Sequence, residues 1–211
     1  MFSRRIFENE KNVSEAGKHD LARVQSLISS MSQLISDLIN YSRVNFPAKE
    51  YKKTDINVLL KKAISELKDT ITEKNAEISV APFPQLKVIP HQIQQLFINL
   101  IINSMNYTKE GVTPNIKIET QQPSREEILE IGGDLEINYV KICVTDNGIG
   151  FSKKYATRIF DPFYRLHNKA DYEGSGLGLT QAKKIVDNHN GFIEAISEIN
   201  LGTTILIYLP L

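Results

Sequence analysis

The sequence predicts an α+β domain, with helices on one face of a mixed sheet, preceded by a long helical arm. Apolar residues recur three and four positions apart over residues 20–44, and helical segments and short strands then follow one another over 50–211. The composition agrees, because 41% hydrophobic and 24% charged residues are typical of a globular protein of this length. We find no internal repeat in the sequence.

The charge balance and the cysteine content exclude several classes of function. Lys and Arg number 25, as do Asp and Glu, which argues against a general nucleic-acid binder and against a polybasic membrane anchor. Four scattered histidines and the single Cys143 give no zinc pattern, and a lone cysteine indicates a reducing compartment. The uncharged run 88–108 holds too many amides to span a membrane. We expect a cytoplasmic chain, or the cytoplasmic part of something longer, without nucleic-acid or membrane contact.

Residues 20–44 are expected to form one amphipathic helix about 36 Å long. Its apolar stripe is too extensive to face water alone, so it needs partner helices, either within one chain or from a second copy. Residues 1–18 supply only a stub of such a partner, and Pro47 ends the long helix. The stripe consists of Leu21, Val24, Leu27, Ile28, Met31, Leu34, Ile35, Leu38 and Tyr41.

The remaining segments predict the elements of the α+β domain. Asp55 is expected to cap a helix that runs to about residue 75, and Pro90 to begin a helix that runs to about residue 107. A third helix is expected over 177–188. The polar stretch 121–135 is expected to be an extended hairpin loop outside the core. Extended segments are expected at 50–54, 78–80, 86–88, 115–120, 139–145, 192–197 and 203–209.

The helix over 90–107 carries an unusual polar stripe. Gln92, Gln95, Asn99, Asn103 and Asn106 fall into one narrow sector by helical phase. Asparagine is a mediocre helix former, so three of them on one stripe add nothing to a core helix. The stripe is therefore either a solvent-facing edge or a row of neutral carbonyl oxygens suited to hydrated Mg²⁺.

Two glycine-containing motifs follow. Asp146-Asn147-Gly148-Ile149-Gly150 comes directly after a strand; an Asn-Gly turn is common, but the second glycine indicates a loop that passes close to something flat. An aspartate at a strand end can accept a hydrogen bond from a purine amino group. Gly174-Ser175-Gly176-Leu177-Gly178 opens a helix, where backbone N–H groups can approach phosphate oxygens. Its spacing matches neither the dinucleotide fingerprint nor a Walker loop. The segment 157–173 is expected to form a mobile lid.

Five motifs together resemble, in order and spacing, the N, G1, F, G2 and G3 boxes of sensor histidine kinases. They are NLIINSMNY (99–107), DNGIG (146–150), IFDPFYR (159–165), GSGLGL (174–179) and GTT (202–204). The resemblance covers about 54–211 and implies the Bergerat-type ATP-binding sandwich shared with gyrase, mismatch-repair and heat-shock chaperone ATPases. Residues 19–44 are similar to the second helix of the family's dimerisation and histidine-phosphotransfer module. The resemblance thus implies a partial dimerisation arm over 1–46 and an ATP-binding catalytic domain over 47–211.

The resemblance also implies roles for individual residues. Asn103 is expected to coordinate Mg²⁺ and Asp146 to bind the adenine amino group, while Arg165 reaches the γ-phosphate; Asn103 and Arg165 are the catalytic candidates. Further contacts with ATP are expected from Asn99, Tyr107, Gly148, Gly150, Gly174, Gly176, Leu177, Gly178 and Thr203.

The implied activity is that of a dimeric protein-histidine kinase, in the cytoplasm or as the cytosolic part of a membrane-bound sensor. It would transfer the γ-phosphoryl group of ATP to a histidine, for relay to the receiver domain of a response regulator. No S-H-E-L-R-like phosphoacceptor motif occurs, and His19 is rejected as phosphoacceptor because it begins the second helix, so the chain is expected to be a truncated kinase.

Two departures from the family pattern stand out. Asn106 occupies the position where the N box usually carries lysine, which leaves open an alternative: a non-catalytic, nucleotide-gated or phosphatase-biased regulator that docks a response regulator. Ser104 replaces the common alanine, which we expect to be tolerated. A Ser/Thr kinase of anti-sigma type is a third, weaker alternative, because it would lack the long helix.

Overall fold

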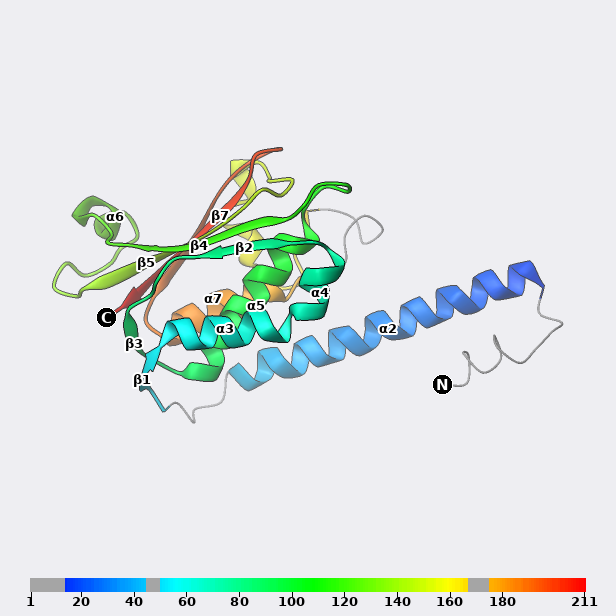
Figure 1. Ribbon diagram of the computed structural model, residues 1–211, viewed down its shortest axis with the longest axis horizontal. Coiled ribbons are helices and arrows are strands. Elements are labelled where there is room, and N and C mark those ends of the chain that lie inside the picture. Colours follow the sequence, from blue (N-terminus) through cyan, green and yellow to red (C-terminus); the bar gives the residue numbers. More distant parts are fainter. Residues whose placement is uncertain (1–13, 45–49, 167–174) are drawn as a thin grey trace. The chain divides into compact units, whose positions relative to one another are not determined.

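The chain divides into two units, Met1–Arg43 and Val44–Leu211, which we describe separately. The computed structural model describes residues 14–44, 50–166 and 175–211 (Figure 1). In the part of the chain so described, no helix combines the length and the hydropathy that a membrane span requires.

The first unit contains helix α2 (Glu15–Val44), which begins five residues earlier than predicted. Ser14 caps it, because its Oγ accepts the Gly17 N–H at 3.1 Å and its carbonyl accepts the Lys18 N–H at 2.9 Å. The expectation that residues up to 18 form a stub of a separate helix is therefore wrong for 15–18. Large apolar side chains of α2 lie exposed, among them Val24, Leu27, Ile28, Met31, Ile35, Leu38 and Ile39.

The second unit is built on a mixed five-stranded sheet in the order β2-β4-β5-β7-β6. Strand β2 pairs parallel with β4, and the other neighbours pair antiparallel, as the predicted mixed sheet requires. The strands are β2 (Glu77–Val80), β4 (Asn115–Gln121), β5 (Tyr139–Asp146), β6 (Phe192–Glu198) and β7 (Gly202–Pro210). A separate antiparallel pair is formed by β1 (Lys52–Asp55) and β3 (Gln85–Val88).

Helices α3 (Ile56–Glu66), α5 (Pro90–Asn106) and α7 (Gly178–Asn188) lie on one side of this sheet (Figure 1). Helix α5 contacts both α3 and α7. Alternate residues of the central strands β5 and β7 face these helices and form the main core with them. These strand residues are Val140, Ile142, Val144, Ile205, Ile207 and Leu209.

The helix predicted over 55–75 is two helices. Asp55 caps α3 as predicted, because its Oδ1 accepts the Asn57 N–H at 2.9 Å. The helix then breaks at Leu67, whose ψ of 8° departs from helical geometry, and α4 (Lys68–Glu73) follows. Because no glycine or proline occurs near Leu67, the sequence offered no local signal for the break.

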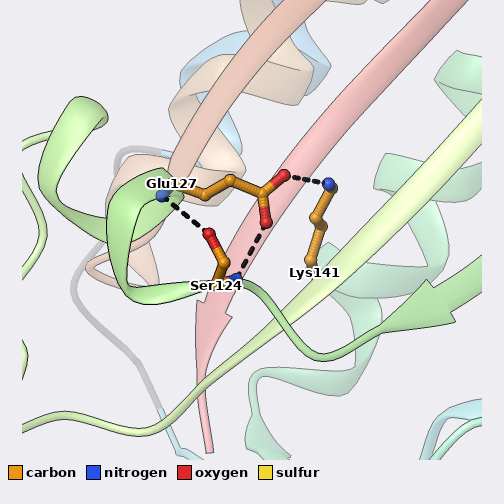
Figure 2. A network of polar contacts seen from close by, with 3 residues as sticks. All are labelled: Ser124, Glu127 and Lys141. Carbon is orange, nitrogen blue, oxygen red and sulfur yellow. Dashed lines mark hydrogen bonds and ion pairs between the residues drawn. The ribbon is translucent and has the colours of Figure 1, made fainter.

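The stretch 121–135, expected to be a loop, contains helix α6 (Arg125–Glu130). Ser124 and Glu127 form a capping box, and Glu127 also pairs with Lys141 of β5 (Figure 2). Ile128 packs into a second apolar cluster, on the sheet face opposite the main core. The loop interpretation missed the S-x-x-E signal that begins the helix. The cluster consists of Ile128, Tyr139, Cys143, Leu206 and Tyr208.

His189 joins the C-terminal end of α7 to the start of α5. Its Nε2 accepts the Ile89 N–H at 3.0 Å, so Nδ1 carries the proton and donates to the Ile185 carbonyl at 2.7 Å. The Tyr51 ring meets the imidazole edge-on at 5.4 Å, and the Tyr51 hydroxyl donates to the Asn188 carbonyl. The start of α5 and the end of α7 are thereby held together.

Candidate functional site

Asp146 is the last residue of β5, and its carboxylate is held on both oxygens. Oδ1 accepts the backbone N–H groups of Gly148 at 2.9 Å and Thr203 at 3.0 Å. Oδ2 accepts the Ser104 hydroxyl at 3.1 Å and, with two lone pairs, can accept one further hydrogen bond. The half-buried carboxylate is thus fixed in position and keeps an acceptor for a donor outside the chain.

The environment of Asp146 opposes its ionisation. Burial raises the pKa of Asp146 above its ordinary value of 3.8, and the hydrogen bonds from Gly148, Thr203 and Ser104 work in the opposite direction. Ser104 is 4% exposed and belongs to α5, so the serine that we expected to be merely tolerated is a direct partner of the carboxylate.

The loop after Asp146 needs its two glycines for reasons internal to the chain. A Cβ on Gly148 would lie 2.7 Å from the Tyr107 carbonyl oxygen, which also accepts the Ile149 N–H at 2.8 Å. Gly150 has φ of +60°, and its Cβ would lie 1.9 Å from the Glu198 carbonyl oxygen. Both glycines allow the loop to pack against α5 and the β6–β7 turn. Their expected contact with a flat ligand stays a prediction.

The polar stripe of α5 faces α7 at one end. Asn99 donates from Nδ2 to Gln181 Oε1 at 2.9 Å, and its Oδ1 accepts the Gln95 amide at 2.9 Å. Asn99 is therefore committed to joining the two helices. Within the described residues the Asn103 side chain makes no hydrogen bond, so its carbonyl oxygen is available to a ligand one turn further along the helix.

The stripe ends beside a lysine. Lys74, the C-cap residue of α4, donates from Nζ to Asn106 Oδ1 at 3.2 Å. The next residue, Tyr107, is the C-cap of α5 and lies against the Asp146 loop through its carbonyl. A cation therefore lies at the position where the sequence had indicated a missing charge.

The described part of the glycine segment, 175–178, lies at the N-terminus of α7, as predicted, and phosphate binding there stays a prediction. Gly176 has φ of +76°, its carbonyl accepts the Phe163 N–H at 3.1 Å, and a Cβ there would lie 3.2 Å from Arg165 Cγ. The Arg165 side chain thus packs beside this segment. Around Gly178, by contrast, no described atom other than those of its chain neighbours and its own helix backbone lies within 4 Å of where a Cβ would be.

Leu177 and Gly174 belong to the same predicted phosphate-binding segment. The Leu177 side chain is only 3% exposed, and its N–H donates to Ser175 Oγ at 3.3 Å, so these groups are used within the protein. Leu177 as a nucleotide contact stays a prediction. Gly174 lies outside the described residues.

Thr203 joins the β6–β7 hairpin to Asp146. Besides its N–H bond to the carboxylate, its hydroxyl lies 2.9 Å from Ser197 Oγ. Ser197 Oγ in turn accepts the Phe151 N–H at 2.9 Å. Asp146, Gly148 and Thr203 are therefore joined by hydrogen bonds, and their contacts with ATP stay a prediction. Ser197 was not predicted from the sequence.

The donors present suit a metal that is held mainly through a ligand. In the part of the chain that the structure describes, no three His, Cys, Asp or Glu residues gather as a metal cluster. Asn103 offers one neutral oxygen, which fits Mg²⁺, because this ion keeps several waters and is commonly held by one or two protein groups plus substrate phosphates. A zinc or calcium centre finds no comparable set of ligands there.

Comparison with known families decides the identity of this fold. The family described as histidine kinase-, DNA gyrase B-, and HSP90-like ATPase matches residues 89–211, more than half of the chain. The chain belongs to this ATPase family. The match includes the asparagine stripe, Asp146, the α7 glycines and Thr203, and it confirms the resemblance on which the Bergerat-type fold was predicted.

Two related proteins each match most of this chain. The chain is 33% identical over 184 residues to the phytochrome-like protein Cph1 of Synechocystis sp., which is 87% of this chain and 23% of that protein. It is 31% identical over 208 residues to the signal transduction histidine-protein kinase ArlS of Staphylococcus epidermidis, 97% of this chain and 41% of that protein. The chain thus spans less than half the length of these relatives.

Solved structures agree on the fold of this ATPase-family chain. Full-length ShkA in complex with AMPPNP is similar with a TM-score of 0.67 at 21% identity, covering 98% of this chain and 41% of that one. The histidine kinase ThkA in complex with the response regulator protein TrrA is similar with a TM-score of 0.66 at 19% identity, covering 99% of this chain and 55% of that one. The predicted α+β sandwich is confirmed.

Proposed function

We propose that residues 47–211 bind Mg·ATP and transfer its γ-phosphoryl group to a histidine of a dimerisation bundle, to which residues 1–46 contribute. The phosphoryl group would then pass to an aspartate in the receiver domain of a response regulator. Support comes from membership of the ATPase family, from the histidine-kinase names of relatives, and from the relative crystallised with a response regulator.

The observation that carries the ATP assignment is the Asp146 carboxylate. Two backbone N–H groups fix Oδ1, and one acceptor position remains on Oδ2. An adenine amino group is the complementary donor, whereas a guanine presents a carbonyl at the equivalent ring position. The Asp146 site therefore favours adenine by hydrogen bonding and disfavours guanine by placing two acceptors against each other.

The phosphates would extend from the adenine along α5 toward α7. The α7 N-terminus offers backbone N–H groups, and Gly178 leaves room for close approach. Asn103 would hold Mg²⁺, which when bound neutralises charge on the phosphates. Arg165, packed beside Gly176, would reach the γ-phosphoryl group and stabilise the charge that develops there.

In the transfer itself, an imidazole nitrogen attacks the γ-phosphorus and the bond to the β–γ bridging oxygen breaks, leaving ADP. This chain contributes mainly the positioning of that in-line geometry. The alternative of a non-catalytic regulator was motivated by Asn106, and the ammonium of Lys74 beside Asn106 weakens that motive.

The test supplies the acceptor separately. The 211-residue chain is incubated with Mg²⁺, γ-labelled ATP and a dimerisation module of a related kinase that carries a phosphoacceptor histidine. We expect acid-labile, alkali-stable label on that histidine with the wild type and none with Asp146→Asn. Mg·ATP binding without labelling, by this chain and by a longer form that carries its own acceptor, would instead favour the non-catalytic regulator.

A further inference from the structure

Lys74 places a positive charge beside the polar stripe of α5. It is the C-cap residue of α4, and α4 ends in a Schellman-type motif: the Ala76 N–H donates to the Ile71 carbonyl at 2.9 Å, and the Asn75 N–H to the Thr72 carbonyl at 3.2 Å. Asn75 adopts the left-handed conformation, with φ of +51°, that such a terminus requires. The Lys74 backbone is therefore fixed.

The side chain of Lys74 crosses from α4 to α5. Its Nζ lies 3.2 Å from Asn106 Oδ1. Asn99, Asn103 and Asn106 are spaced four and three residues apart, so they share one face of α5 and neighbouring members lie about 5–6 Å apart at Cβ. The ammonium therefore stands at the C-terminal end of the row that contains the uncommitted Asn103 amide.

Among the described residues, no carboxylate forms a salt bridge with Lys74. None of the salt bridges among them involves Lys74. An ammonium has three donors, and its bond to Asn106 uses one of them. The remaining donors suit the oxygens of an anion, and hydrogen bonds between charged partners are about twice as strong as neutral ones.

We infer that Lys74 binds a phosphate group of the nucleotide from the α4 side, with Asn106 holding the ammonium in place. This inference rests on the proposed ATP-binding function. It makes Lys74 an affinity-determining residue for nucleoside di- and triphosphates, contributed by an element outside the matched family segment 89–211. Adenosine, which lacks phosphates, gains nothing from it.

A purely structural role would look different. A cation near the C-terminus of α5 also offsets the negative end of the helix dipole, and loss of that effect would lower stability and weaken every ligand alike. Selective loss of phosphate-bearing ligands separates the two roles. Salt provides a second distinction, because an exposed ammonium–phosphate contact is screened as ionic strength rises.

The experiment is calorimetric titration of the full 211-residue chain with Mg·ATP, Mg·ADP and adenosine. For Lys74→Ala we expect about tenfold weaker ATP binding, equivalent to about 1.4 kcal/mol, and less than about a twofold change for adenosine. Lys68→Ala removes the same charge from the same helix and should leave all three affinities unchanged. Lys74→Ala combined with Asn106→Lys returns a cation to the stripe and should restore ATP affinity to within about threefold.

The possible results distinguish a failure of the Lys74 inference from a failure of the proposed ATP-binding function. Equal ATP binding by the wild type and Lys74→Ala would overturn the inference alone, as would an equal loss for ATP and adenosine or an equal effect of Lys68→Ala. A wild-type chain that binds no adenine nucleotide would overturn the proposed function as well.

Discussion

Asp146 combines a half-buried carboxylate with a position at the end of a central strand. Its place after a strand was visible in the sequence, because the D-N-G-I-G motif is local. Its partners were not, because Ser104 lies 42 residues away and Thr203 lies 57 residues away. The same holds for Asn99 and Gln181, 82 residues apart, and for Lys74 and Asn106, 32 residues apart. Pairs of this kind are set by how helices pack, which one sequence does not reveal.

The raised pKa of Asp146 predicts a specific pH dependence of stability. The folded protein holds this proton more tightly than the unfolded chain, so the contribution of Asp146 to stability is present in acid and is lost as pH rises through the folded pKa. Urea unfolding across a pH series should show this component in the wild type and not in Asp146→Asn. Ser104→Ala removes a hydrogen bond that lowers the pKa, so it should move the transition to higher pH; an unmoved transition would contradict the role of Ser104.

At the scale of elements, substitutions of the glycines at the start of α7 distinguish effects on stability from effects on ligand binding. Gly178 does not have a positive φ, and apart from its chain neighbours and its own helix backbone no described atom lies within 4 Å of its hypothetical Cβ. Gly178→Ala should therefore maintain stability or raise it by about 0.4–1 kcal/mol, while weakening ATP binding about tenfold by crowding the phosphates. Thermal unfolding and calorimetric titration measure the two effects.

Gly176→Ala is the matched contrast to Gly178→Ala. Its φ of +76° should make the variant less stable by about 1–3 kcal/mol even without ligand. Unchanged ATP affinity in Gly178→Ala would contradict phosphate binding at the α7 N-terminus.

Helix α6 shows which signals a single sequence carries at this scale. Its S-x-x-E box was readable, but the polar composition of 121–135 favoured a loop. The apolar cluster that receives Ile128 comes from β5 and β7, far along the chain. The break at Leu67 had no local signal, whereas the capping aspartate of α3 and the proline at the start of α5 were sufficient to predict those two helix starts.

The ion pair between α6 and β5 should stabilise the fold (Figure 2). The Lys141 side chain is only 11% exposed, so Glu127→Ala would leave a mostly buried donor without its partner and lower the free energy of unfolding by about 2 kcal/mol. The hydrogen bond from Lys141 lowers the pKa of Glu127, so this contribution is present at neutral pH and is lost as acid protonates the glutamate. Urea unfolding measures both effects.

Two further variants control the Glu127→Ala measurement. Glu127→Ala combined with Lys141→Met should recover most of the loss, because the apolar side chain needs no partner. Glu119→Ala, which breaks the more exposed pair with Lys117, should cost less than about 0.5 kcal/mol. A double variant as unstable as Glu127→Ala would show that the loss comes from the capping box and not from the unpaired Lys141 charge.

At the scale of the whole molecule, the two units differ in how far they bury their apolar side chains. The sheet unit buries its own apolar faces, whereas α2 exposes a row of large aliphatic side chains, with Met31 61% exposed. The sequence predicted this stripe because helical periodicity is local. It could not say what covers the stripe, since the choice between a second copy and another segment depends on residues outside one helix.

We predict that α2 mediates homodimerisation. Ile28→Glu combined with Ile35→Glu places two charges on the apolar stripe and should convert a dimer into a 23.9 kDa monomer in sedimentation equilibrium. Ala22→Glu combined with Ser26→Glu places the same charges on the opposite side of the helix and should leave the dimer intact. A wild type that is monomeric at all concentrations tested would contradict the prediction.

The most direct test of adenine recognition by Asp146 is the affinity of this chain for Mg·ATP before and after Asp146→Asn, measured by calorimetry with Mg·GTP as the competing ligand. The asparagine can still accept the Gly148 and Thr203 N–H groups, so the fold should be retained, but the side-chain nitrogen it places toward the base donates rather than accepts. We expect the wild type to prefer ATP to GTP, and the variant to lose at least about tenfold in ATP affinity, or 1.4 kcal/mol. Equal ATP affinity of a folded Asp146→Asn variant and the wild type would contradict the assignment of Asp146 as the adenine-binding residue.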